Sequence, residues 1–513
     1  MTVRDPAVEQ DVLVVGGGHN ALVAATLLAR AGLSVRVLER RSAWGGAAVS
    51  GHPFDVDARL SRYAYLVSLF PRALLAQLGV DLELRRRVVG SCSPDGRRAL
   101  VVGDDTDATR RSFDQVTGDP GEYDRWVAWQ QVVRRAAEAV APTLLSPLVS
   151  EQVMRDRMGE EAWSLITQPI GPALERTFTS DLVRGVVLTD GLIGTFARSD
   201  ESSLRQNRCF LYHVIGNGTG DWDVPVGGMG ALTAQLESGA RAAGVQLDAG
   251  AEVTSIDSDG RTVVARTAAG RSHPAAALIC TAAPAVLDRL LGWEPVRPTA
   301  PGSQIKVNMV VSRLPRLRSG VDPRLAFAGT LHVNERMSQL DLAFDSAGLP
   351  DPLPCEVYCH TLTDPSILGP ELARSGAHTL TLFGLHTPAS YFSADPAASA
   401  QAALDAALRS LQSVLAEPLE DCLLRAPDGS PCVEIHTPHD LQVDLAMPEG
   451  NIFHGDLAWP WAETDSEVGA WGVETHLPLV FIGGSGARRG GAVSGIGGHN
   501  AAMAVQELLR NRR

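Results

Sequence analysis

Short apolar runs that alternate with helical segments dominate the pattern of hydrophobic and polar positions at the start of the chain. Residues 11–15 (DVLVV) form a short apolar run that is typical of a buried parallel strand. The next segment predicts a helix closed by Gly32, and residues 34–38 predict a second strand. This order of strand, helix and strand predicts an α/β domain that begins near the N-terminus.

The turn between the first strand and its helix has the glycine pattern of a dinucleotide-binding motif. Gly16, Gly18 and Ala21 fit the spacing G-x-G-x-x-G/A. The first residue permits a tight turn, the second lets the backbone approach a pyrophosphate, and the third allows close helix–strand packing. The start of the helix supplies unpaired N–H groups and the positive end of its dipole. The alternative is a glycine-rich turn that binds no ligand.

The second strand ends at an acidic residue, as dinucleotide-binding folds require. The carboxylate of Glu39 can accept hydrogen bonds from a ribose diol, and an acid here disfavours a 2′-phosphate. The nucleotide is therefore FAD or NAD rather than NADP. A second glycine pair, Gly45 and Gly46, follows Arg40 where the chain could return past the pyrophosphate. This pair indicates FAD.

A second strand, glycine-rich turn and helix occur near the C-terminus. Residues 478–482 are an apolar run that leads into GGSGARRGGAVSGIGGHN, and residues 501–509 predict the final helix. Two such motifs at opposite ends of the chain imply that the termini meet around one long cofactor. A helix N-terminus there could place positive potential beside the flavin.

These motifs resemble a known family. The pattern GGGHNxLVAA, VLERR and GGAA within residues 16–48 resembles the FAD-dependent phytoene desaturase-like oxidoreductases. The resemblance is closest to the branch that contains pyridine nucleotide-disulfide oxidoreductase domain-containing protein 2 and its bacterial relatives. It continues in family order through SRYAYLVSLFPR, DGLIGTFA, PVGGMGAL, IKVNMVV, GNIFHGDL and FIGGSGARRGGAVSG.

The resemblance implies the fold class and the domain organisation. It predicts an α/β protein with a discontinuous, glutathione-reductase-type Rossmann-like FAD domain and an α+β substrate domain, as in amine oxidases and phytoene desaturases. Residues 1–75, 225–300 and 445–513 would form the FAD-binding domain. Residues 76–224 and 301–444 would form the substrate-binding or lid domain.

The predicted FAD contacts combine the glycine motifs with positions carried over by resemblance. Val253 would contact the adenine through its backbone, and otherwise it is an ordinary strand valine. The predicted cofactor-binding residues are Gly16, Gly18, His19, Asn20, Ala21, Glu39, Arg40, Gly45, Gly46, Ala47, Val253, Gly486, Ala492, Val493 and Gly495.

The predicted activity is that of an FAD-dependent dehydrogenase or oxidase. Such an enzyme removes a hydride from a C–H or N–H bond of a small to medium metabolite and so desaturates C–C or C–N. The chain has no C-x-x-C motif, which excludes a disulfide reductase. By resemblance, Lys306 lies on the strand whose lysine in amine oxidases holds a water near flavin N5. Otherwise it is a lysine in a salt bridge or at a strand edge.

Aromatic and basic residues beside the matching blocks are candidate substrate contacts. Relatives commonly have His-Pro-Gly-Gly-Gly where this chain has Arg488 and Arg489, which would favour an anionic or oxygen-rich substrate. Alternatively the two arginines face solvent or pair with local carboxylates, and a Trp-Pro-Trp segment is often a packing element. Asp190 is best interpreted as a structural carboxylate. The predicted substrate residues are Tyr212, His213, Trp459, Trp461 and Arg488.

Composition and charge limit the classes of partner that this chain can bind. The chain has 513 residues and a net charge of −14, which argues against nucleic acid. No run reaches the ~18–20 apolar residues of a spanning helix, and residues 1–10 lack the pattern of a secretory signal. The seven dispersed cysteines favour a cytoplasmic protein, and Cys355, Cys359 and His360 lack a second ligand cluster, so no metal site is predicted.

Two other functions stay open at this point. One is a carotenoid-type desaturase or isomerase that acts on a long polyene, although the charges in residues 151–208 do not suit a membrane-docking surface. The other is a non-catalytic binding protein of the same fold. The sequence does not determine the substrate, the oligomeric state or the electron acceptor, which could be oxygen, a quinone or another flavoprotein.

Overall fold

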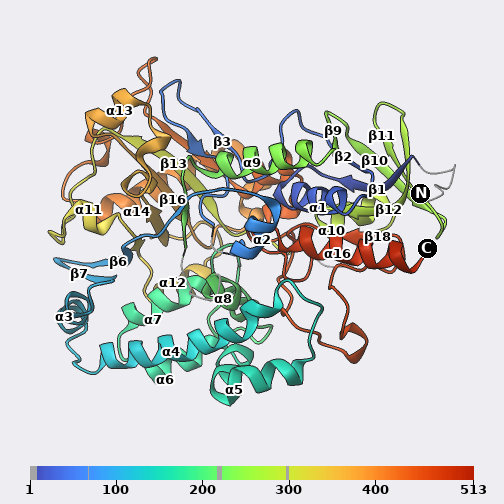
Figure 1. Ribbon diagram of the computed structural model, residues 1–513. Coiled ribbons are helices and arrows are strands. Elements are labelled where there is room, and N and C mark those ends of the chain that lie inside the picture. The colour runs from blue at the N-terminus through green and yellow to red at the C-terminus, as the bar shows by residue number, and fades with distance from the viewer. Residues whose placement is uncertain (1–8, 68, 217–221, 296–299, 513) are drawn as a thin grey trace.

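The computed structural model describes residues 9–67, 69–216, 222–295 and 300–512 (Figure 1). Two seven-stranded sheets organise this part of the chain, and a layer of helices lies beneath them. The first and last helices of the chain, α1 (His19–Arg30) and α16 (Ile496–Asn511), pack against each other beside the first sheet. The predicted α/β fold class is confirmed.

The first sheet has a parallel centre built from stretches of chain that are far apart in sequence. Its order is β10-β11-β12-β1-β2-β9, and β18 pairs with β12. β1 is parallel to β12 and β2, while β10 and β11 form an antiparallel edge. The strands are β1 (Gln10–Val15), β2 (Val35–Glu39), β9 (Gln246–Ala249), β10 (Val253–Ser258), β11 (Val263–Thr267), β12 (Ser272–Cys280) and β18 (Val480–Ile482).

Helices from both ends of the chain cover this sheet. α1 packs against α16 and α9, and all three contribute to one apolar core. A Cβ on Gly498 would lie only 2.1 Å from the carbonyl oxygen of Asn20, so the crossing of α16 over α1 requires glycine. The helices are α1 (His19–Arg30), α2 (Arg72–Leu78), α9 (Met229–Ala242), α10 (Pro284–Leu290) and α16 (Ile496–Asn511).

The second sheet presents two chemically different faces. Val307, Leu382 and Val357 belong to an apolar core that includes residues of α14 (Pro396–Val414), whereas Lys306 and Glu356 alternate with them and face the other way. The sheet order is β17-β13-β16-β15-β14-β6-β7. The strands are β6 (Val89–Asp95), β7 (Arg98–Gly103), β13 (Ile305–Val311), β14 (Thr330–Val333), β15 (Cys355–Tyr358), β16 (His378–Gly384) and β17 (Val433–His436).

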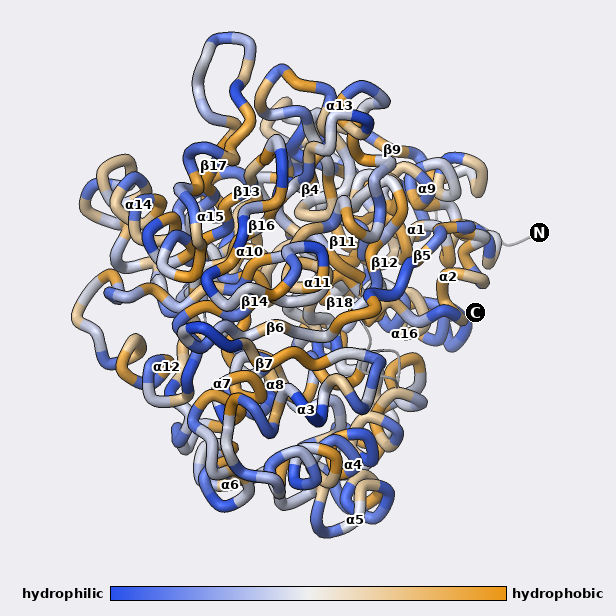
Figure 2. Tube along the Cα trace, turned by 90° about the vertical axis from the view of Figure 1, so that its left-hand side faces the viewer, coloured by the Kyte–Doolittle hydropathy of each residue, from blue (hydrophilic) through white to orange (hydrophobic). Residues whose placement is uncertain are grey.

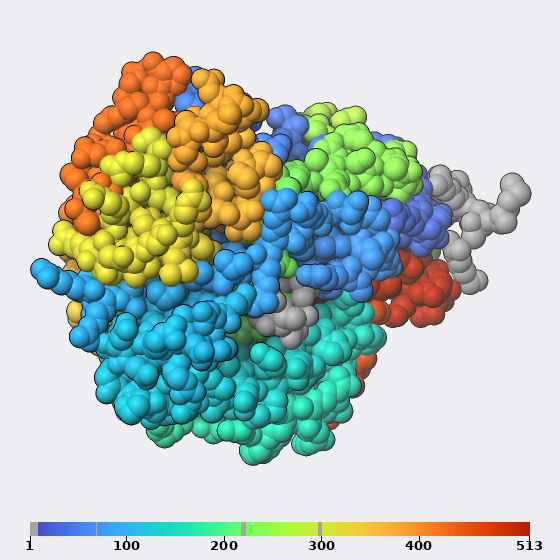
Figure 3. Space-filling view, turned by 60° about the vertical axis from the view of Figure 1, so that its left-hand side comes forward, coloured from blue at the N-terminus to red at the C-terminus, as the bar shows by residue number. Residues whose placement is uncertain are grey.

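A helical layer lies below the second sheet and forms one continuous body in Figure 3. Its core contains Trp129, Phe178 and Phe210, and hydrophilic and hydrophobic positions alternate along α4, α5 and α6, as in amphipathic helices (Figure 2). The helices are α3 (Thr106–Thr117), α4 (Glu122–Val140), α5 (Glu151–Thr167), α6 (Ile170–Thr177), α7 (Asp181–Leu188), α8 (Arg205–Ile215) and α12 (Met337–Phe344).

The remaining elements connect these layers or, as α14 does, pack against a sheet. Within the described residues, no helix is long and apolar enough to cross a membrane, and the seven cysteines are all buried and free. The remaining strands and α-helices are β3 (Ser50–Gly51), β4 (Leu60–Ser61), β5 (Leu84–Arg85), β8 (Val224–Pro225), α11 (Pro323–Ala326), α13 (Pro370–Ser375), α14 (Pro396–Val414) and α15 (Pro438–Leu445). The predicted domain bounds stay a prediction.

Candidate functional site

The glycine motif borders a cavity of about 270 Å³ at the start of α1. Strand ends of the first sheet form one side of this cavity, and the turn before α1 forms another. Its lining includes Gly16, Gly17, Gly18, His19, Asn20, Glu39, Arg40, Gly46, Ala47, Val253, Thr281, His454 and Ser485. Predicted cofactor residues from three separate stretches of chain thus meet around one space.

Close packing of backbone against backbone explains why glycines occupy the turn before α1. Gly16 has φ +98°, and a Cβ there would lie 2.6 Å from Oγ1 of Thr281, so only glycine fits. Gly45 donates its N–H to the carbonyl of Gly17 at 2.8 Å, which brings the second glycine pair beside the first. A Cβ on Gly18 would meet no described atom within 4 Å. The backbone at Gly18 is therefore open to a ligand.

Glu39 is fixed at the end of β2 by backbone donors. Its carboxylate accepts the N–H of Gly17 at 2.5 Å and the N–H of Arg41 at 2.7 Å. Both oxygens retain further lone pairs, because a carboxylate can accept about four hydrogen bonds. Glu39 can therefore hold the turn and still accept a ribose hydroxyl.

Two histidines offer polar atoms to the same cavity. Nε2 of His19 and Nδ1 of His454 are buried and have no hydrogen-bond partner among the described residues. Burial lowers the pKa of each ring to about 4, so both are neutral at pH 7. A buried polar atom without a partner is costly unless a ligand satisfies it. These atoms, the open backbone at Gly18 and the acid at Glu39 fit a dinucleotide.

The C-terminal glycine-rich turn closes over the start of α1. Gly498 donates its N–H to Oδ1 of Asn20 at 3.4 Å. Gly486 packs against Pro284. Of this segment only Ser485 lines the cavity among the described residues. The predicted contacts of Gly486, Ala492, Val493 and Gly495 with FAD therefore stay predictions.

Lys306 is the only lysine in the chain. It lies in β13, is 5% exposed, and donates from Nζ to the carbonyl of Ser61 at 2.5 Å. Nζ also lies 5.8 Å from the ring centroids of Tyr65 and Phe383. Burial lowers its pKa to about 7, against the opposing effect of Glu434. Unlike an arginine, this group can gain and lose a proton near neutral pH.

A second cavity of about 270 Å³ lies between the polar face of the second sheet and the helical layer. Side chains of α4, α7 and α8, together with Trp222, form its apolar wall, which includes Trp126, Trp129, Val133, Val186 and Phe210. Its polar wall includes Arg87, Ser91, Asp190, His213, Thr330, His332, Glu356 and Tyr358.

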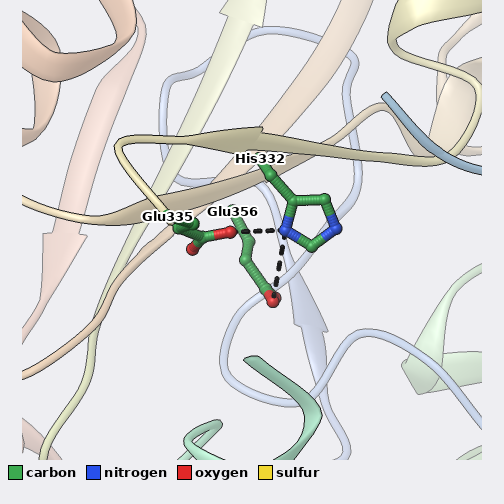
Figure 4. Close-up of side chains that lie close together, drawn as sticks. All are labelled: His332, Glu335 and Glu356. Atoms are coloured by element: carbon green, nitrogen blue, oxygen red, sulfur yellow. Dashed lines mark hydrogen bonds and ion pairs between the residues drawn. The ribbon is translucent and has the colours of Figure 1, made fainter. Parts of the chain in front are cut away.

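Two residues of the polar wall, His332 and Glu356, form a buried acidic cluster with Glu335 (Figure 4). Nδ1 of His332 is hydrogen-bonded to Glu335 and lies 4.0 Å from Oε1 of Glu356. The three potential ligand atoms lie within 4.8 Å of one another. Burial raises the pKa of Asp190 to about 6 and that of Glu356 to about 8, raises that of Glu335 well above its usual range, and lowers that of His332. The cluster therefore retains protons at pH 7.

A family model for flavin containing amine oxidoreductase matches residues 22–352. The chain belongs to the flavin-containing amine oxidoreductase family. It is accordingly an FAD-dependent oxidoreductase, and the predicted cofactor, FAD, is confirmed.

Similarity to relatives and to solved structures extends over nearly the whole chain. Uncharacterized protein Rv0897c of Mycobacterium tuberculosis is 50% identical over 98% of both chains. Pyridine nucleotide-disulfide oxidoreductase domain-containing protein 2 of Mus musculus is 28% identical over 98% of this chain and 94% of its own. A putrescine oxidase variant superposes with a TM-score of 0.61 at 17% identity, covering 99% of this chain and all of its own.

Cyclohexylamine oxidase from Brevibacterium oxydans has a TM-score of 0.59 at 14% identity, covering 98% of this chain and 99% of its own. At this identity the two structures show a shared fold. The predicted membership of an FAD-dependent oxidoreductase family is confirmed, and the predicted resemblance to pyridine nucleotide-disulfide oxidoreductase domain-containing protein 2 is found over nearly the whole chain.

Within this family fold, the predicted substrate residues take different positions. His213 lines the second cavity. Tyr212 instead donates to the carbonyl of Ala458 at 3.1 Å and accepts the N–H of Arg489. Trp459 and Trp461 stack on each other with centroids 4.9 Å apart. Tyr212, Trp459 and Trp461 are not among the described residues that line the second cavity. They belong to the apolar core of the helical layer and hold the C-terminal segment against it.

The two arginines of the C-terminal turn are occupied by protein groups. Arg488 pairs with Glu463 at 2.9 Å and Glu467 at 2.8 Å, which is the local pairing that the sequence left as an alternative. Arg489 is 1% exposed and donates to the carbonyls of Thr143, Ser146 and Trp471. An anionic substrate therefore has no support from these two arginines.

Sequence reasoning missed part of the polar wall. Asp190, interpreted as structural, lies at the cavity in a 3-10 turn (Thr189–Gly191). Glu356 and His332 were not identified. The available signal was β15 itself, CEVY, in which an acid alternates with core residues on a strand that is buried throughout.

We expect replacement of Glu39 by alanine to weaken FAD binding by at least ~10-fold, because a buried ribose would lose a charge-assisted acceptor. Titration of apoprotein with FAD, followed by flavin fluorescence, measures this. Glu507→Ala, at an exposed position of α16, is the control. Equal affinity of the Glu39 variant and the wild type would contradict the ribose role.

We expect Lys306→Met to slow reoxidation by oxygen by at least ~10-fold, because the variant lacks the buried amine. The wild-type rate should change with pH around 7, where Lys306 loses its charge as pH rises. Photoreduction followed by rapid mixing with oxygen measures this without a substrate. Arg425→Met, which removes an exposed cation, is the control. Unchanged reoxidation would rule out the role of Lys306 with oxygen.

We expect Arg489→Met to lower the free energy of unfolding by about 3 kcal/mol, because three buried carbonyls would lose a charged donor. Arg425→Met, which breaks only an exposed pair with Glu420, should lower it by less than ~1 kcal/mol. Chemical denaturation of the two variants compares the same substitution in buried and exposed positions. Similar losses would show that Arg489 is not a structural tie.

Proposed function

We propose that this oxidoreductase removes a hydride from a small to medium metabolite that carries a basic group, forming C=N or C=C. Bound FAD supplies the acceptor for the hydride. The protein must then position the substrate and exclude water from it. The observation that carries the proposal is the second cavity, which combines an aromatic wall with carboxyl groups.

The size and lining of this cavity support a compact substrate. Its volume of about 270 Å³ is near the lower end of the range for small-molecule sites, about 300–1,000 Å³. Trp126, Trp129 and Phe210 offer flat apolar surfaces for the body of the substrate. A long polyene would need an extended apolar channel, so we rank the carotenoid-type alternative second.

The charge of the cavity supports a cationic group on the substrate. With its pKa raised to about 6, Asp190 is ionised at pH 7 and can pair with an ammonium group. Arg87 carries the opposite charge, whereas Glu356 and Glu335 are protonated at pH 7, so Asp190 is the carboxylate that the ammonium group would pair with. The solved relatives named above act, by their names, on putrescine and cyclohexylamine, which are amines.

Oxidation of a C–C bond in a substrate without a basic group, which includes the carotenoid-type reaction, is the second candidate. A component of the limonene dehydrogenase of Castellaniella defragrans is 36% identical over 103 residues, which cover 18% of this chain. A non-catalytic binding role has no support, because the family consists of oxidoreductases.

We also propose that residues 76–224 and 301–444 form the substrate-binding domain, since their elements line the second cavity.

Anaerobic mixing of the FAD-loaded protein with a panel of compounds tests the substrate class. We expect putrescine, cyclohexylamine or benzylamine to bleach the flavin band near ~450 nm, and the neutral analogue cyclohexanol to leave it unchanged. Asp190→Asn should raise the Kd of the active amine by at least ~10-fold.

Asp200→Asn, at an exposed position, is the control for the loss of one charge. Bleaching by a hydrocarbon or polyene but by no amine would contradict the proposed substrate class.

A further inference from the structure

A row of side chains crosses the polar face of the second sheet. The strand registers place Lys306 opposite Phe383, Phe383 opposite Glu356, and Glu356 opposite His332. Residues directly opposite each other on neighbouring strands point to the same face. The row therefore runs from Lys306, over three neighbouring strands, to the acidic cluster at the second cavity.

Tyrosines connect the two ends of this row. The ring of Tyr65 lies 4.5 Å from that of Phe383 and 4.8 Å from that of Tyr358, and Nζ of Lys306 lies 5.8 Å from its centroid. Tyr358 donates to Oε2 of Glu356 at 2.5 Å. Ring contacts of Tyr65 and this hydrogen bond of Tyr358 thus connect Lys306 to Glu356.

The other carboxyl oxygen of Glu356, Oε1, is not hydrogen-bonded to Tyr358. It lies 4.0 Å from Nδ1 of His332, and Glu356 lines the second cavity although it is only 1% exposed. His332 is held by Glu335, whose Oε1 is buried without a hydrogen-bond partner among the described residues. The titratable and charged groups that act on Glu356 or on this cluster are Asp190, Arg87, His332, Glu335, Tyr65, Tyr358, Cys209 and Cys355.

The burial of so many acids implies that protons are shared among them. Three carboxyl groups in one dry region cannot all be ionised beside a single arginine, because isolated buried charges are strongly disfavoured. A cationic substrate in the cavity would favour the ionised form of the nearest carboxyl group. A carboxylate that becomes ionised beside the substrate is suited to accept a proton from it.

We propose that Glu356 is the proton acceptor of the oxidation, and that His332 and Glu335 position its carboxyl group. The proposal rests on the proposed function. The C–H bond breaks and its hydrogen leaves with the electron pair as hydride to the flavin. The N–H bond, or the neighbouring C–H bond, breaks and its proton passes to the Glu356 carboxylate. The electron pair left behind forms C=N or C=C.

Glu356 meets the requirements better than its neighbours. Nζ of Lys306 already donates to the carbonyl of Ser61. Asp190 is the weaker base, since burial raises its pKa to about 6 against about 8 for Glu356. Because only the ionised form accepts a proton, the rate of hydride transfer should rise with pH until Glu356 is fully ionised.

Single-turnover reduction by the amine that bleaches the wild type tests the acceptor. Glu356→Gln keeps the shape of the side chain and the bond from Tyr358 but carries no basic oxygen. We expect reduction to be slower by about 100-fold or more, the rise of rate with pH to vanish, and the Kd of the amine to change by less than ~3-fold. Glu420→Gln, at an exposed position, should match the wild type.

Glu335→Gln tests the positioning role. A second acid raises the pKa of Glu356, so its removal should move the midpoint of the rate profile to lower pH while leaving the rate at high pH near that of the wild type. A wild-type profile in Glu335→Gln would overturn the positioning role. A wild-type rate and pH profile in Glu356→Gln would overturn the acceptor role.

Thermal stability gives a readout that needs no substrate. A carboxyl group whose pKa is raised on folding binds more protons in the folded state, so stability falls as pH rises from its ordinary value of 4.5 to about 8. The Tm of Glu356→Gln relative to the wild type should therefore increase between pH 5 and pH 9. A constant difference would overturn the proton-bearing role, whatever the amine panel shows.

Metal analysis completes the test, because His332, Glu335 and Glu356 could instead bind a cation. We expect elemental mass spectrometry of the holoenzyme to find no stoichiometric divalent metal. A bound metal that is lost in Glu356→Gln would make this carboxylate a ligand and would overturn the proposal. Failure of every amine to bleach the flavin would overturn the proposed function, and the stability comparison would still decide whether Glu356 carries the proton.

Discussion

The approach of backbone to backbone at the start of α1 is the constraint on which the cofactor site depends. Gly16 lies against Thr281, Gly45 bonds Gly17, and Gly498 lies against Asn20. Any Cβ at Gly16 or Gly498 would overlap its neighbour and push these segments apart. The close contact leaves open the one position, Gly18, where a pyrophosphate has to reach the helix N-terminus. Four distant parts of the chain must therefore fold together before the site exists.

The second sheet holds polar groups in an interior from which water is excluded. Its apolar face packs on α14, while its other face holds Lys306, Glu356 and His332 under the helical layer. Burial shifts the pKa of each of these groups toward its neutral form. A face of this kind lowers stability, which is typical of sites retained for chemistry.

The fold followed from the sequence where local pattern and long-range packing agree. Residues 34–38 predicted β2, which the structure has at Val35–Glu39. The last helix was predicted to begin at residue 501, because Gly497 and Gly498 have low helix propensity. In the structure it begins at Ile496. Both glycines are needed where α16 touches the backbone of other segments. The same contact that fixes the helix therefore hides its start from a propensity argument.

The sequence by itself determined the dinucleotide motif and indicated FAD, because glycine spacing and strand–turn–helix order are local and are imposed by the dinucleotide. Its resemblance to a known family implied the fold class and the oxidoreductase family. Only the tertiary structure decided which side chains form the substrate cavity. Asp190, His332 and Glu356 come from segments without a shared motif and meet through strand register and helix packing. It also decided that Arg488 and Arg489 are bound by protein groups. Hydrogen-bond partners depend on three-dimensional neighbours, which local spacing does not specify.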